Sequence, residues 1–399
     1  MTGLDGAAAL DLIWSILPDA RLVGGAVRDL LASRPTADFD LATAVPPQAI
    51  LDRLRAGGIK VVPTGLAHGT VTAVVKGRPY EITTLRRDLE TDGRHAVVVW
   101  TDDWREDAAR RDFTINAMSF GQDGVLHDYF GGADDLGAGK VRFVGNARQR
   151  IEEDGLRILR FFRFQARYGS GAPDADAIEA IAGTTGRLSI LSAERVWSEL
   201  RRLLDVPEPM DAIRLMRRLG VLDALLPDID VERLAGLVKL DAPTDSLLRL
   251  SALSGSPAAV VAERFRLSNA DAQRLDALRS GSCPAPGMDD DGLRRLLADD
   301  PGDRLVDRSW LAEIDSPTPG HEWHALRQRL QTIPRPVFPL SGRDAVKAGL
   351  VPGPMVGEIL RDVGSWWRAG GCVADRAACL SQLARIAAGR PAESAGSGM

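Results

Sequence analysis

A glycine turn followed by an aspartate pair constrains this chain more than any other feature. The segment 22–29 reads Leu-Val-Gly-Gly-Ala-Val-Arg-Asp, and Asp38-Phe-Asp40 follows it. Two glycines after a short apolar strand let the backbone approach a phosphate closely, and the next helix N-terminus favours negative charge. Asp38 and Asp40 are two apart on a predicted strand, so both carboxylates point to one face. This arrangement suits Mg²⁺ clamped between protein and a triphosphate.

Each half of this feature has an ordinary explanation, a tight turn or an exposed acidic strand end. Their combination with Gly25 and Arg28 favours a phosphate site. Arg28 lies one turn into the predicted helix, where its guanidinium could bind phosphate oxygens bidentately. The turn is neither a GxGxxG motif nor a GK[ST] loop, which excludes dinucleotide-binding and Walker-type sites.

Composition indicates a globular protein of two to three domains. The 399 residues are 45% apolar and 26% charged, and the formal net charge is −5. That net charge argues weakly against a nucleic-acid partner. However, the segment 141–170 holds seven arginines and three acidic residues, so one element is locally basic.

The sequence predicts a cytoplasmic location without a membrane span. The first 23 residues carry aspartates where a secretory signal has basic residues, and no run of eighteen apolar residues exists. Three cysteines cannot form a disulfide framework. Cys372 and Cys379 are seven residues apart, which predicts two buried thiols on one helix face.

The first 140 residues alternate between strand and helix patterns. Strands are predicted over Ala20–Val23, Phe39–Thr43, Ile59–Val62, Thr70–Val75, Tyr80–Leu85, Phe113–Phe120 and Val125–Tyr129, and helices over Ala26–Ala32 and Pro46–Ala56. Arg86–Asp103 is polar without a clear period, which predicts a long functional loop. From Asn146 onward the pattern is almost entirely helical, with helices over Ser192–Leu204, Asp211–Leu219 and Asp271–Leu278.

Three motifs together resemble one enzyme family. Residues 22–40 resemble the nucleotidyltransferase motif of the class II tRNA CCA-adding enzymes and the related bacterial poly(A) polymerases. Arg110-Arg-Asp-Phe-Thr-Ile-Asn-Ala117 resembles the family's ribose-recognition motif, and Asp128–Gly132 resembles its hinge. Glu153-Asp-Gly-Leu-Arg157, followed by Arg160 and Arg163, resembles its amino-acid template for the incoming base. The resemblance is specific over residues 20–170 and continues more diffusely through 219–227 and 340–367.

The chemistry of the third motif supports a base-selecting role. Asp154, Arg157, Arg160 and Arg163 are three residues apart, so on a helix they form one strip. An ionised aspartate only accepts hydrogen bonds and an arginine only donates them. Cytosine and adenine present an exocyclic amine beside a ring-nitrogen acceptor, whereas uracil and guanine present a carbonyl there. The pair therefore selects C and A, with a solvated ion-pair face as the alternative.

The resemblance implies an α+β fold with a helical extension. The expected parts are a polymerase β-like mixed-sheet nucleotidyltransferase head at 1–140, a helical neck with the base template at 141–205, a helical body at 206–335 and a tRNA-binding helical tail at 336–399. An enzyme of this family is expected to add C, C and A to the tRNA 3′ end from CTP and ATP, with release of pyrophosphate and without a nucleic-acid template.

Site residues follow from the same resemblance. Asp38 and Asp40 are expected to hold Mg²⁺, Gly25 and Arg28 to contact phosphates, Arg111 and Asp112 to hold the ribose, and Asp154, Arg157, Arg160 and Arg163 to bind the nucleotide. Glu81 is expected as a third catalytic carboxylate, although a strand glutamate paired to an arginine explains it equally well. The expected partners are the tRNA 3′ end with its acceptor arm, and no protein partner is predicted.

Other functions remain open at this level. Poly(A) polymerases share the head, but they are typically longer chains with basic extensions, whereas this chain ends in small neutral residues. The polar segment 86–103 resembles a loop that CC-adding members shorten, which favours full CCA addition over CC-only or A-only activity. A non-catalytic RNA-binding module is disfavoured by the intact aspartate pair.

Overall fold

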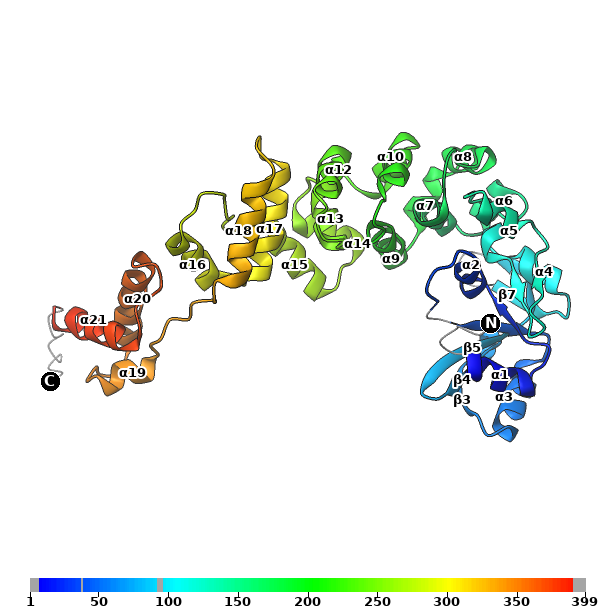
Figure 1. Cartoon of the computed structure of the whole chain (residues 1–399), viewed down its shortest axis with the longest axis horizontal. Coiled ribbons are helices and arrows are strands. Elements are labelled where there is room, and N and C mark those ends of the chain that lie inside the picture. The colour runs from blue at the N-terminus through cyan, green and yellow to red at the C-terminus, as the bar shows by residue number, and fades with distance from the viewer. Residues whose placement is uncertain (1–6, 37–38, 92–95, 390–399) are drawn as a thin grey trace, which may run out of the picture. The chain divides into compact units, whose positions relative to one another are not determined.

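The computed structural model describes residues 7–36, 39–91 and 96–389 (Figure 1). The chain folds as two compact units, one of residues 1–231 with 264–266, the other of residues 232–263 with 267–399. Within the described residues, no helix is long and apolar enough to cross a membrane. The predicted division into head, neck, body and tail stays a prediction.

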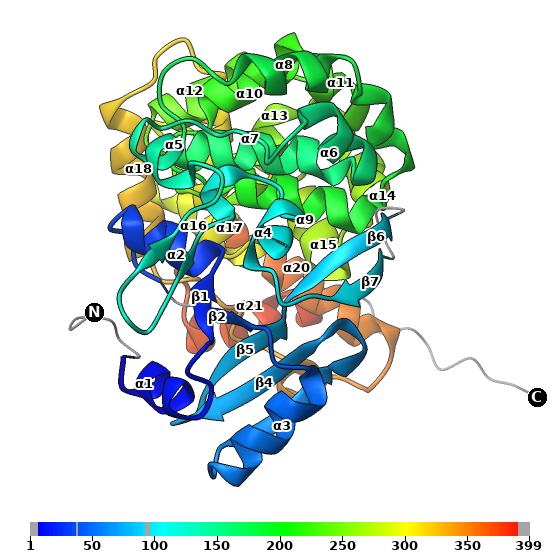
Figure 2. The ribbon, with the colours of Figure 1, turned by 90° about the vertical axis from the view of Figure 1, so that its right-hand side faces the viewer.

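The first unit begins with a mixed sheet of order β3-β4-β5-β2-β1-β8-β9 (Figure 2). Its strands are β1 (Arg21–Val23), β2 (Asp40–Thr43), β3 (Lys60–Gly65), β4 (Thr70–Val75), β5 (Arg78–Thr84), β8 (Ser119–Phe120) and β9 (Leu126–His127). Only the β2–β5 pair is parallel; the other neighbours are antiparallel. The parallel pairing sets Asp40 directly beside Glu81.

Two helices build the main core against this sheet. Helices α1 (Ala7–Ile16) and α3 (Pro47–Ala56) contact each other, and α3 packs on β3 and β4. Their buried side chains, including Trp14 and Ile50, join strand residues such as Ile82 in one apolar cluster. Trp14 Nε1 donates to the Ala20 carbonyl at 2.8 Å, so the buried indole is satisfied. The core fixes the sheet that presents Asp40.

Helices form most of the rest of this unit. They are α2 (Gly25–Leu31), α4 (Trp104–Ala109), α5 (Gly132–Gly137), α6 (Ala147–Glu153), α7 (Leu156–Tyr168), α8 (Ala175–Ala182), α9 (Ala193–Leu204), α10 (Met210–Arg218) and α11 (Val221–Leu225), with 3₁₀ turns at Leu66–His68, Thr114–Asn116 and Thr185–Ile190. Helix α7 contacts α9 and α10. Phe161 of α7 packs against Phe113 and Phe143 at ring-centroid distances of 6.4 and 6.0 Å. This aromatic contact joins α7 to the segment that follows α4.

The prediction of a long loop over Arg86–Asp103 is wrong for most of that segment. Strands β6 (Arg86–Thr91) and β7 (Ala96–Trp100) pair antiparallel as a two-stranded sheet, with Arg86 opposite Trp100. Residues 92–95 between them lie outside the described part. Three consecutive valines, 97–99, are good strand formers. Strand β6, Arg-Arg-Asp-Leu-Glu-Thr, holds a single apolar residue, so the alternation that identifies most strands is missing there.

The strand predicted over Phe113–Phe120 is also mostly wrong. A 3₁₀ turn occupies Thr114–Asn116, and only Ser119–Phe120 is strand. Asn116 Nδ2 donates to Asp112 Oδ1 at 3.0 Å, and Thr114 Oγ1 donates to Asp135 Oδ2 at 2.5 Å. Such side-chain bonds compete with strand pairing. The strand predicted over Val125–Tyr129 shortens to Leu126–His127.

The regular elements in the described residues of the second unit are helices. Its helices are α12 (Val231–Lys239), α13 (Ser246–Leu253), α14 (Ala258–Phe265, which ends in the first unit), α15 (Asn269–Arg279), α16 (Asp290–Asp299), α17 (Gly302–Ile314), α18 (His321–Thr332), α19 (Gly342–Lys347), α20 (Pro354–Ala369) and α21 (Arg376–Ala388). A buried ion pair of 2.7 Å joins Arg327 of α18 to Glu313 of α17. It lies beside Trp310, whose ring centroid is 3.4 Å from the Arg327 guanidinium carbon.

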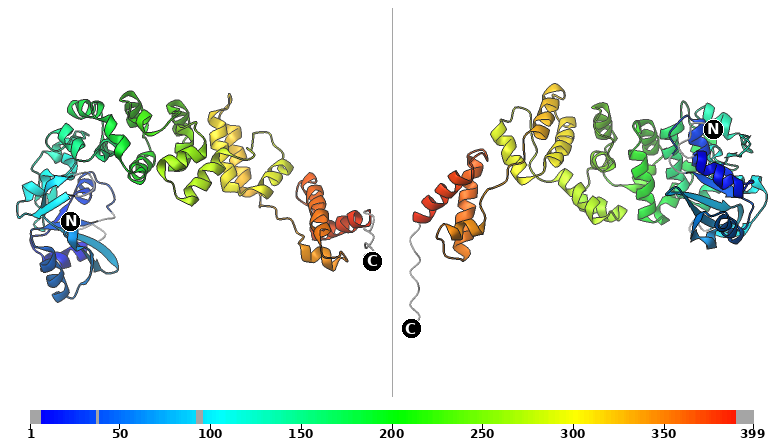
Figure 3. Two further views of the ribbon diagram at one scale, coloured as in Figure 1. Left: turned by 180° about the vertical axis from the view of Figure 1, so that it is seen from behind. Right: turned by 60° about the horizontal axis from the view of Figure 1, so that its bottom comes forward.

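The two cysteines predicted on one helix lie on different segments. Cys372 follows α20 in a left-handed turn with φ of 60°, and Cys379 belongs to α21. Both are buried in the apolar cluster formed by α19, α20 and α21, whose helices are orange and red in Figure 3. Gly370 and Gly371 end α20 before the second cysteine is reached, so a spacing of seven does not mean one helix.

Candidate active site

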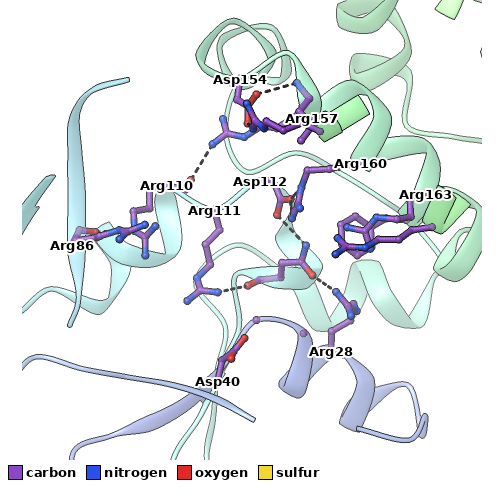
Figure 4. A pocket seen from close by; sticks show the side chains of 17 residues that line it. Arg28, Asp40, Arg86, Arg110, Arg111, Asp112, Asp154, Arg157, Arg160 and Arg163 are labelled. Carbon is purple, nitrogen blue, oxygen red and sulfur yellow. Dashed lines mark hydrogen bonds and ion pairs between the residues drawn. The ribbon is translucent and has the colours of Figure 1, made fainter. Parts of the chain in front are cut away.

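An arginine-rich cavity of about 730 Å³ lies in the first unit, beside the N-terminus of α2, the start of β2 and helix α7 (Figure 4). Nine arginines line it, namely Arg28, Arg86, Arg110, Arg111, Arg157, Arg160, Arg163, Arg195 and Arg202, against the three acidic residues Asp40, Asp112 and Asp154. Such an excess of positive charge in a concave site attracts polyanions. The predicted residues Gly25, Arg28, Asp40, Arg111, Asp112, Asp154, Arg157, Arg160 and Arg163 all line this one cavity.

Two carboxylates stand side by side at the sheet end of the cavity. Asp40 and Glu81 are register partners on the parallel strands β2 and β5, and both are exposed. Side chains of such partners project from the same face of a sheet. A smaller hollow of about 170 Å³ is lined by both, and Asp40 also lines the large cavity. Hard carboxylate oxygens suit a divalent cation. Asp38 lies outside the described residues.

The glycine turn before α2 is needed for space as well as for conformation. Gly24 has φ of 63°, and a Cβ there would lie 2.9 Å from Arg111 Nη1. Any other residue would be strained and would displace that guanidinium. Arg111 is held by the Asn116 carbonyl and by Asp107, at 3.3 Å each. The turn therefore lets an arginine approach the start of α2.

Arg28 lines the cavity but is already engaged by protein groups. Its Nη1 donates to Asn116 Oδ1 at 2.5 Å, and its Nε and Nη2 donate to Asp29 Oδ1 at 3.1 and 3.0 Å. Its guanidinium carbon lies 4.5 Å from the Tyr168 ring centroid. Tyr168 in turn donates its hydroxyl to Asp29. Arg28 thus ties α2 to the last turn of α7.

Asp112 anchors one side of the site from a buried position. Its Oδ1 accepts from Phe113 N at 2.9 Å and from Asn116 Nδ2 at 3.0 Å, and its Oδ2 accepts from Arg160 Nε at 2.7 Å. Burial raises the pKa of Asp112, but Arg160 and these hydrogen bonds outweigh it and hold the pKa below its usual value. The carboxylate is therefore ionised and fixes the guanidinium of Arg160.

The predicted template strip is interrupted at its first member. Helix α6 ends at Glu153, Asp154 is extended with φ of −151°, and α7 begins at Leu156, so Asp154 is not on the helix that carries Arg157. Asp154 Oδ2 accepts from Arg195 Nη2 at 2.7 Å, and its Oδ1 accepts from Leu156 N at 3.1 Å. The predicted continuous helix is wrong because the backbone leaves the helical conformation at Asp154, and α7 begins only after Gly155, its N-cap.

Arg157 and Asp154 face the same cavity without forming an ion pair in the described contacts. Arg157 Nη1 instead donates to Glu153 Oε2 at 2.5 Å and to the Arg150 carbonyl at 2.8 Å. Its backbone N–H donates to the Asp154 carbonyl at 3.0 Å, which keeps the two residues adjacent. Each charged side chain is thus held in place by a separate partner.

Glu199 of α9 organises the arginines of α7, and the sequence did not reveal this. Its side chain is 4% exposed and lies 2.6 Å from Arg163 Nε, 3.5 Å from Arg160 Nη1 and 3.5 Å from Arg202 Nη1. Residues 160 and 199 are far apart in the chain, so only the tertiary contact of α7 with α9 reveals the cluster. The spacing of the apolar residues Val196, Leu200 and Leu203 in α9 puts Glu199 on the buried face of that helix. This is the sequence feature from which a buried, paired carboxylate could have been predicted.

Asp107 and Arg195 are two further site residues that sequence reasoning missed. Asp107 is buried and accepts from Arg110 at 2.7 Å and from Arg86 N at 3.3 Å. Burial raises the pKa of Asp107, but the guanidinium groups of Arg110 and Arg111 outweigh it and the pKa is lowered. Arg195 lies in the helix predicted over Ser192–Leu204, but its contact with Asp154 depends on tertiary packing and has no local sequence pattern.

Comparison with known proteins gives these motifs a family. Residues 20–142 match the family described as "Poly A polymerase head domain", and residues 172–232 match "Probable RNA and SrmB- binding site of polymerase A". The human "CCA tRNA nucleotidyltransferase 1, mitochondrial" is 35% identical, over 92% of this chain and 86% of the relative. The "CCA-adding enzyme" of Geobacillus stearothermophilus is 32% identical over 88% of each chain.

Solved structures agree with the sequence relatives. The crystal structure of the Bacillus stearothermophilus CCA-adding enzyme in complex with CTP superposes with a TM-score of 0.76 at 26% identity, covering 96% of this chain and 98% of that one. The predicted fold class, a mixed-sheet nucleotidyltransferase head followed by helices, is confirmed. The chain belongs to the family of CCA-adding tRNA nucleotidyltransferases.

Proposed function

We propose that this chain adds C, C and A to the 3′ end of tRNA from CTP and ATP, releasing pyrophosphate, without a nucleic-acid template. One observation carries the proposal. A single cavity of about 730 Å³ joins Asp40 at the sheet to Asp154 and Arg157 at the start of α7. Carboxylates for nucleotidyl transfer and a donor–acceptor pair suited to C and A thus face one space.

Enzymes of this family use a divalent metal, and we assign Mg²⁺ to Asp38 and Asp40, with Glu81 as a third carboxylate. Glu81 is the register partner of Asp40, and both are exposed toward a shared hollow. Bound Mg²⁺ would supply charge stabilisation at the phosphates and activate the attacking hydroxyl. The carboxylates of the chain would determine the position of the bound Mg²⁺.

Phosphate binding is assigned to the turn and the arginines around it. Gly25 begins α2, and Arg28 lies one turn further along the same helix. Arginine forks match phosphate geometry and remain charged at any pH of interest. Arg111 and Asp112 are assigned to the ribose side, where Asp112 is fixed by Asn116 and Arg160. Preorganised charges of this kind stabilise a transferring phosphoryl group.

Base selection is assigned to Asp154 and Arg157, with Arg160 and Arg163 further along α7. A carboxylate has about four lone-pair positions, so Asp154 can still accept from an exocyclic amine while Arg195 and Leu156 N bind it. Arg157 carries five N–H donors, of which several remain for a ring nitrogen. Arg195 and Glu153 then act as the partners that orient this pair.

The remaining assignments concern the RNA and the compartment. We assign tRNA binding to the helices from residue 336 onward, within a head, neck, body and tail divided at 140, 205 and 335. The name of the human relative places that protein in mitochondria, and a cytoplasmic location for this chain stays a prediction.

The decisive experiment is single-nucleotide incorporation. The protein is incubated with tRNA that lacks its last three nucleotides and with CTP, ATP, UTP or GTP, alone and in pairs, and the products are sized. We expect two additions with CTP alone and exactly one more with CTP and ATP, and none with an Asp40→Ala control. A ladder of many A residues would mean poly(A) synthesis. Additions that stop after CC, or that require CC already in place, would mean a partial enzyme.

A further inference from the structure

A second hollow of about 530 Å³ adjoins the nucleotide cavity in the first unit. It lies between the residues that follow α2, the last turns of α7, and the connection from α9 to α10. Its charged lining residues are Arg34, Arg163, Arg167, Arg202, Asp205 and Glu208. Arg163 and Arg202 also line the nucleotide cavity, so the two spaces share a wall. Of these charged lining residues, Arg163 alone belongs to a motif that the sequence shares with the family.

The turn at Ser33, after α2, places Arg34 at the hollow. Ser33 adopts φ of 54°, which is unusual for a residue with a side chain, and Arg34 N then donates to the Asp29 carbonyl at 2.8 Å. Arg34 Nη2 donates to the Arg167 carbonyl at 2.8 Å, and its guanidinium carbon lies 4.9 Å from the Tyr168 ring centroid. These contacts hold an exposed guanidinium at the end of α7.

The shared wall is equally fixed and carries surplus positive charge. Glu199 is buried, and its one carboxylate lies within 3.5 Å of guanidinium nitrogens of Arg163 and Arg202. The hollow as a whole has four arginines against Asp205 and Glu208. Arginine is weakly hydrated and presents a rigid fork, so a group of four favours a multiply charged phosphate.

The position along α7 separates the hollow from the base site. Arg157, Arg160 and Arg163 line the nucleotide cavity, whereas Arg163 and Arg167 line the hollow. The rise from Arg157 to Arg167 is about 15 Å on an α-helix. Asp154, the base-selecting carboxylate, does not line the hollow. The hollow therefore lies beyond the cavity on the side away from the base.

We propose that this hollow is an exit subsite for inorganic pyrophosphate, an inference that rests on the proposed function. In nucleotidyl transfer the RNA 3′-oxygen bonds to the α-phosphorus and the hydroxyl proton passes to water. The bond from the α-phosphorus to the bridging oxygen breaks, and pyrophosphate leaves with that electron pair. Pyrophosphate carries several negative charges. Arg163 and Arg202, which line both spaces, bind it as it moves from the cavity into the hollow. Asp205 and Glu208 keep its affinity low enough for release.

The competing ligand is a phosphodiester of the RNA strand. A phosphodiester carries one negative charge, whereas the four arginines that line the hollow match a polyphosphate better. The two ligands differ in their readouts. Loss of an RNA contact raises the KM for tRNA and lowers the dependence of that KM on salt concentration. Loss of a pyrophosphate contact instead weakens product inhibition by pyrophosphate.

The test compares Arg34→Ala and Arg167→Ala with Arg201→Ala. Arg201 is an exposed arginine of α9 that lines neither space, so it is a matched control for lost charge. Binding of inorganic pyrophosphate to the full-length protein is measured by calorimetry without RNA or nucleotide. The inhibition constant of pyrophosphate against CTP is measured in the addition reaction. Thermal unfolding checks that each variant is folded, and Arg34→Lys tests the fork while keeping the charge.

We expect Arg34→Ala and Arg167→Ala each to weaken pyrophosphate binding and inhibition about tenfold, and Arg34→Lys to lie between them and the wild type. Arg201→Ala should change neither value. Unaltered pyrophosphate constants in both alanine variants would overturn the inference, as would an equal rise in the KM for CTP or an effect on tRNA alone. If wild-type protein binds pyrophosphate but adds no nucleotide to tRNA, the proposed function fails while the binding arm still decides the subsite.

Discussion

The carboxylate of Asp154 is paired with Arg195, whose Nη2 lies 2.7 Å from Oδ2. Arg157, which follows Asp154 by three residues in the family motif, is bonded instead to Glu153. The base-selecting pair therefore consists of two side chains that are each oriented from outside the pair. The orientation of the base-selecting pair can therefore be tested separately from base recognition. Arg195, which orients Asp154, can be replaced without changing Asp154 or Arg157, the two residues proposed to bind the base.

Arg195→Ala should reduce base selection without removing the selecting carboxylate. The variant removes the Arg195 contact that orients Asp154, so kcat/KM for CTP and ATP should fall about tenfold, the equivalent of one charge-assisted hydrogen bond of about 1.5 kcal/mol. Discrimination against UTP should weaken in the same variant. Kinetics with all four nucleotides on one tRNA measures both effects. Arg195→Lys should recover part of the loss, whereas an unchanged UTP-to-CTP ratio in the alanine variant would show that Arg195 has no orienting role.

Asp154→Asn tests recognition itself. The amide is nearly isosteric but can donate to a carbonyl, so UTP and GTP incorporation should rise relative to CTP and ATP. Arg157→Ala should instead lower C and A incorporation by about one to two orders of magnitude, because a ring acceptor is left unmatched at about 1–3 kcal/mol. The readout is kcat/KM for each nucleotide. A uniform loss in Asp154→Asn, with no change in ratio, would move base selection to Arg160 and Arg163.

The sequence predicted the sheet and the site motifs well where local chemistry determines them. Strand β4 matches its predicted bounds of Thr70–Val75, because a mostly β-branched run with one fully buried face, Val71, Ala73 and Val75, has a clear pattern. The β6–β7 ribbon was missed because strands outside the core lack that pattern. Gly25, Arg28 and Asp40 were found through one short motif. Glu199 and Arg195 were not, since their roles depend on how α9 packs against α7.

The carboxylates at the sheet should be distinguishable by mutation. Asp40→Ala should abolish both C and A addition, because a proposed metal ligand is removed, while the fold persists since Asp40 is exposed. Glu81→Gln keeps shape and removes charge, and it should lower kcat by at least tenfold if Glu81 is a third catalytic carboxylate. Steady-state kinetics across Mg²⁺ concentrations measures both. Wild-type kcat in Glu81→Gln would assign Glu81 to strand structure, and a tenth of wild-type activity in Asp40→Ala would refute its catalytic role.

Asp112 gives a prediction for stability against pH. Its pKa in the folded protein is lowered, so its stabilisation is present above the unfolded value of about 3.9 and is lost as pH falls below it. Asp112→Asn should cost about 2 kcal/mol near pH 7, because Arg160 loses a charged partner. The difference in free energy of unfolding between the two proteins should shrink as the pH falls below about 4, the pKa of the unfolded carboxyl. A difference that is independent of pH would mean that the charge of Asp112 does not stabilise the fold.

The last prediction concerns the proposed tRNA-binding tail. Arg343 and Lys347 of α19 and Arg361 of α20 are exposed on helices with their own apolar core, so alanine there should leave the fold intact. If they contact phosphates, the triple alanine variant should raise the KM for tRNA and leave the KM for CTP unchanged. The dependence of log KM on log salt concentration should fall by about one per lost contact, because each contact releases counterions. A matched triple variant at the exposed Arg53, Arg55 and Arg78 of the first unit is the control for net charge. Equal salt slopes in the tail variant and the wild type would place the tRNA contacts elsewhere.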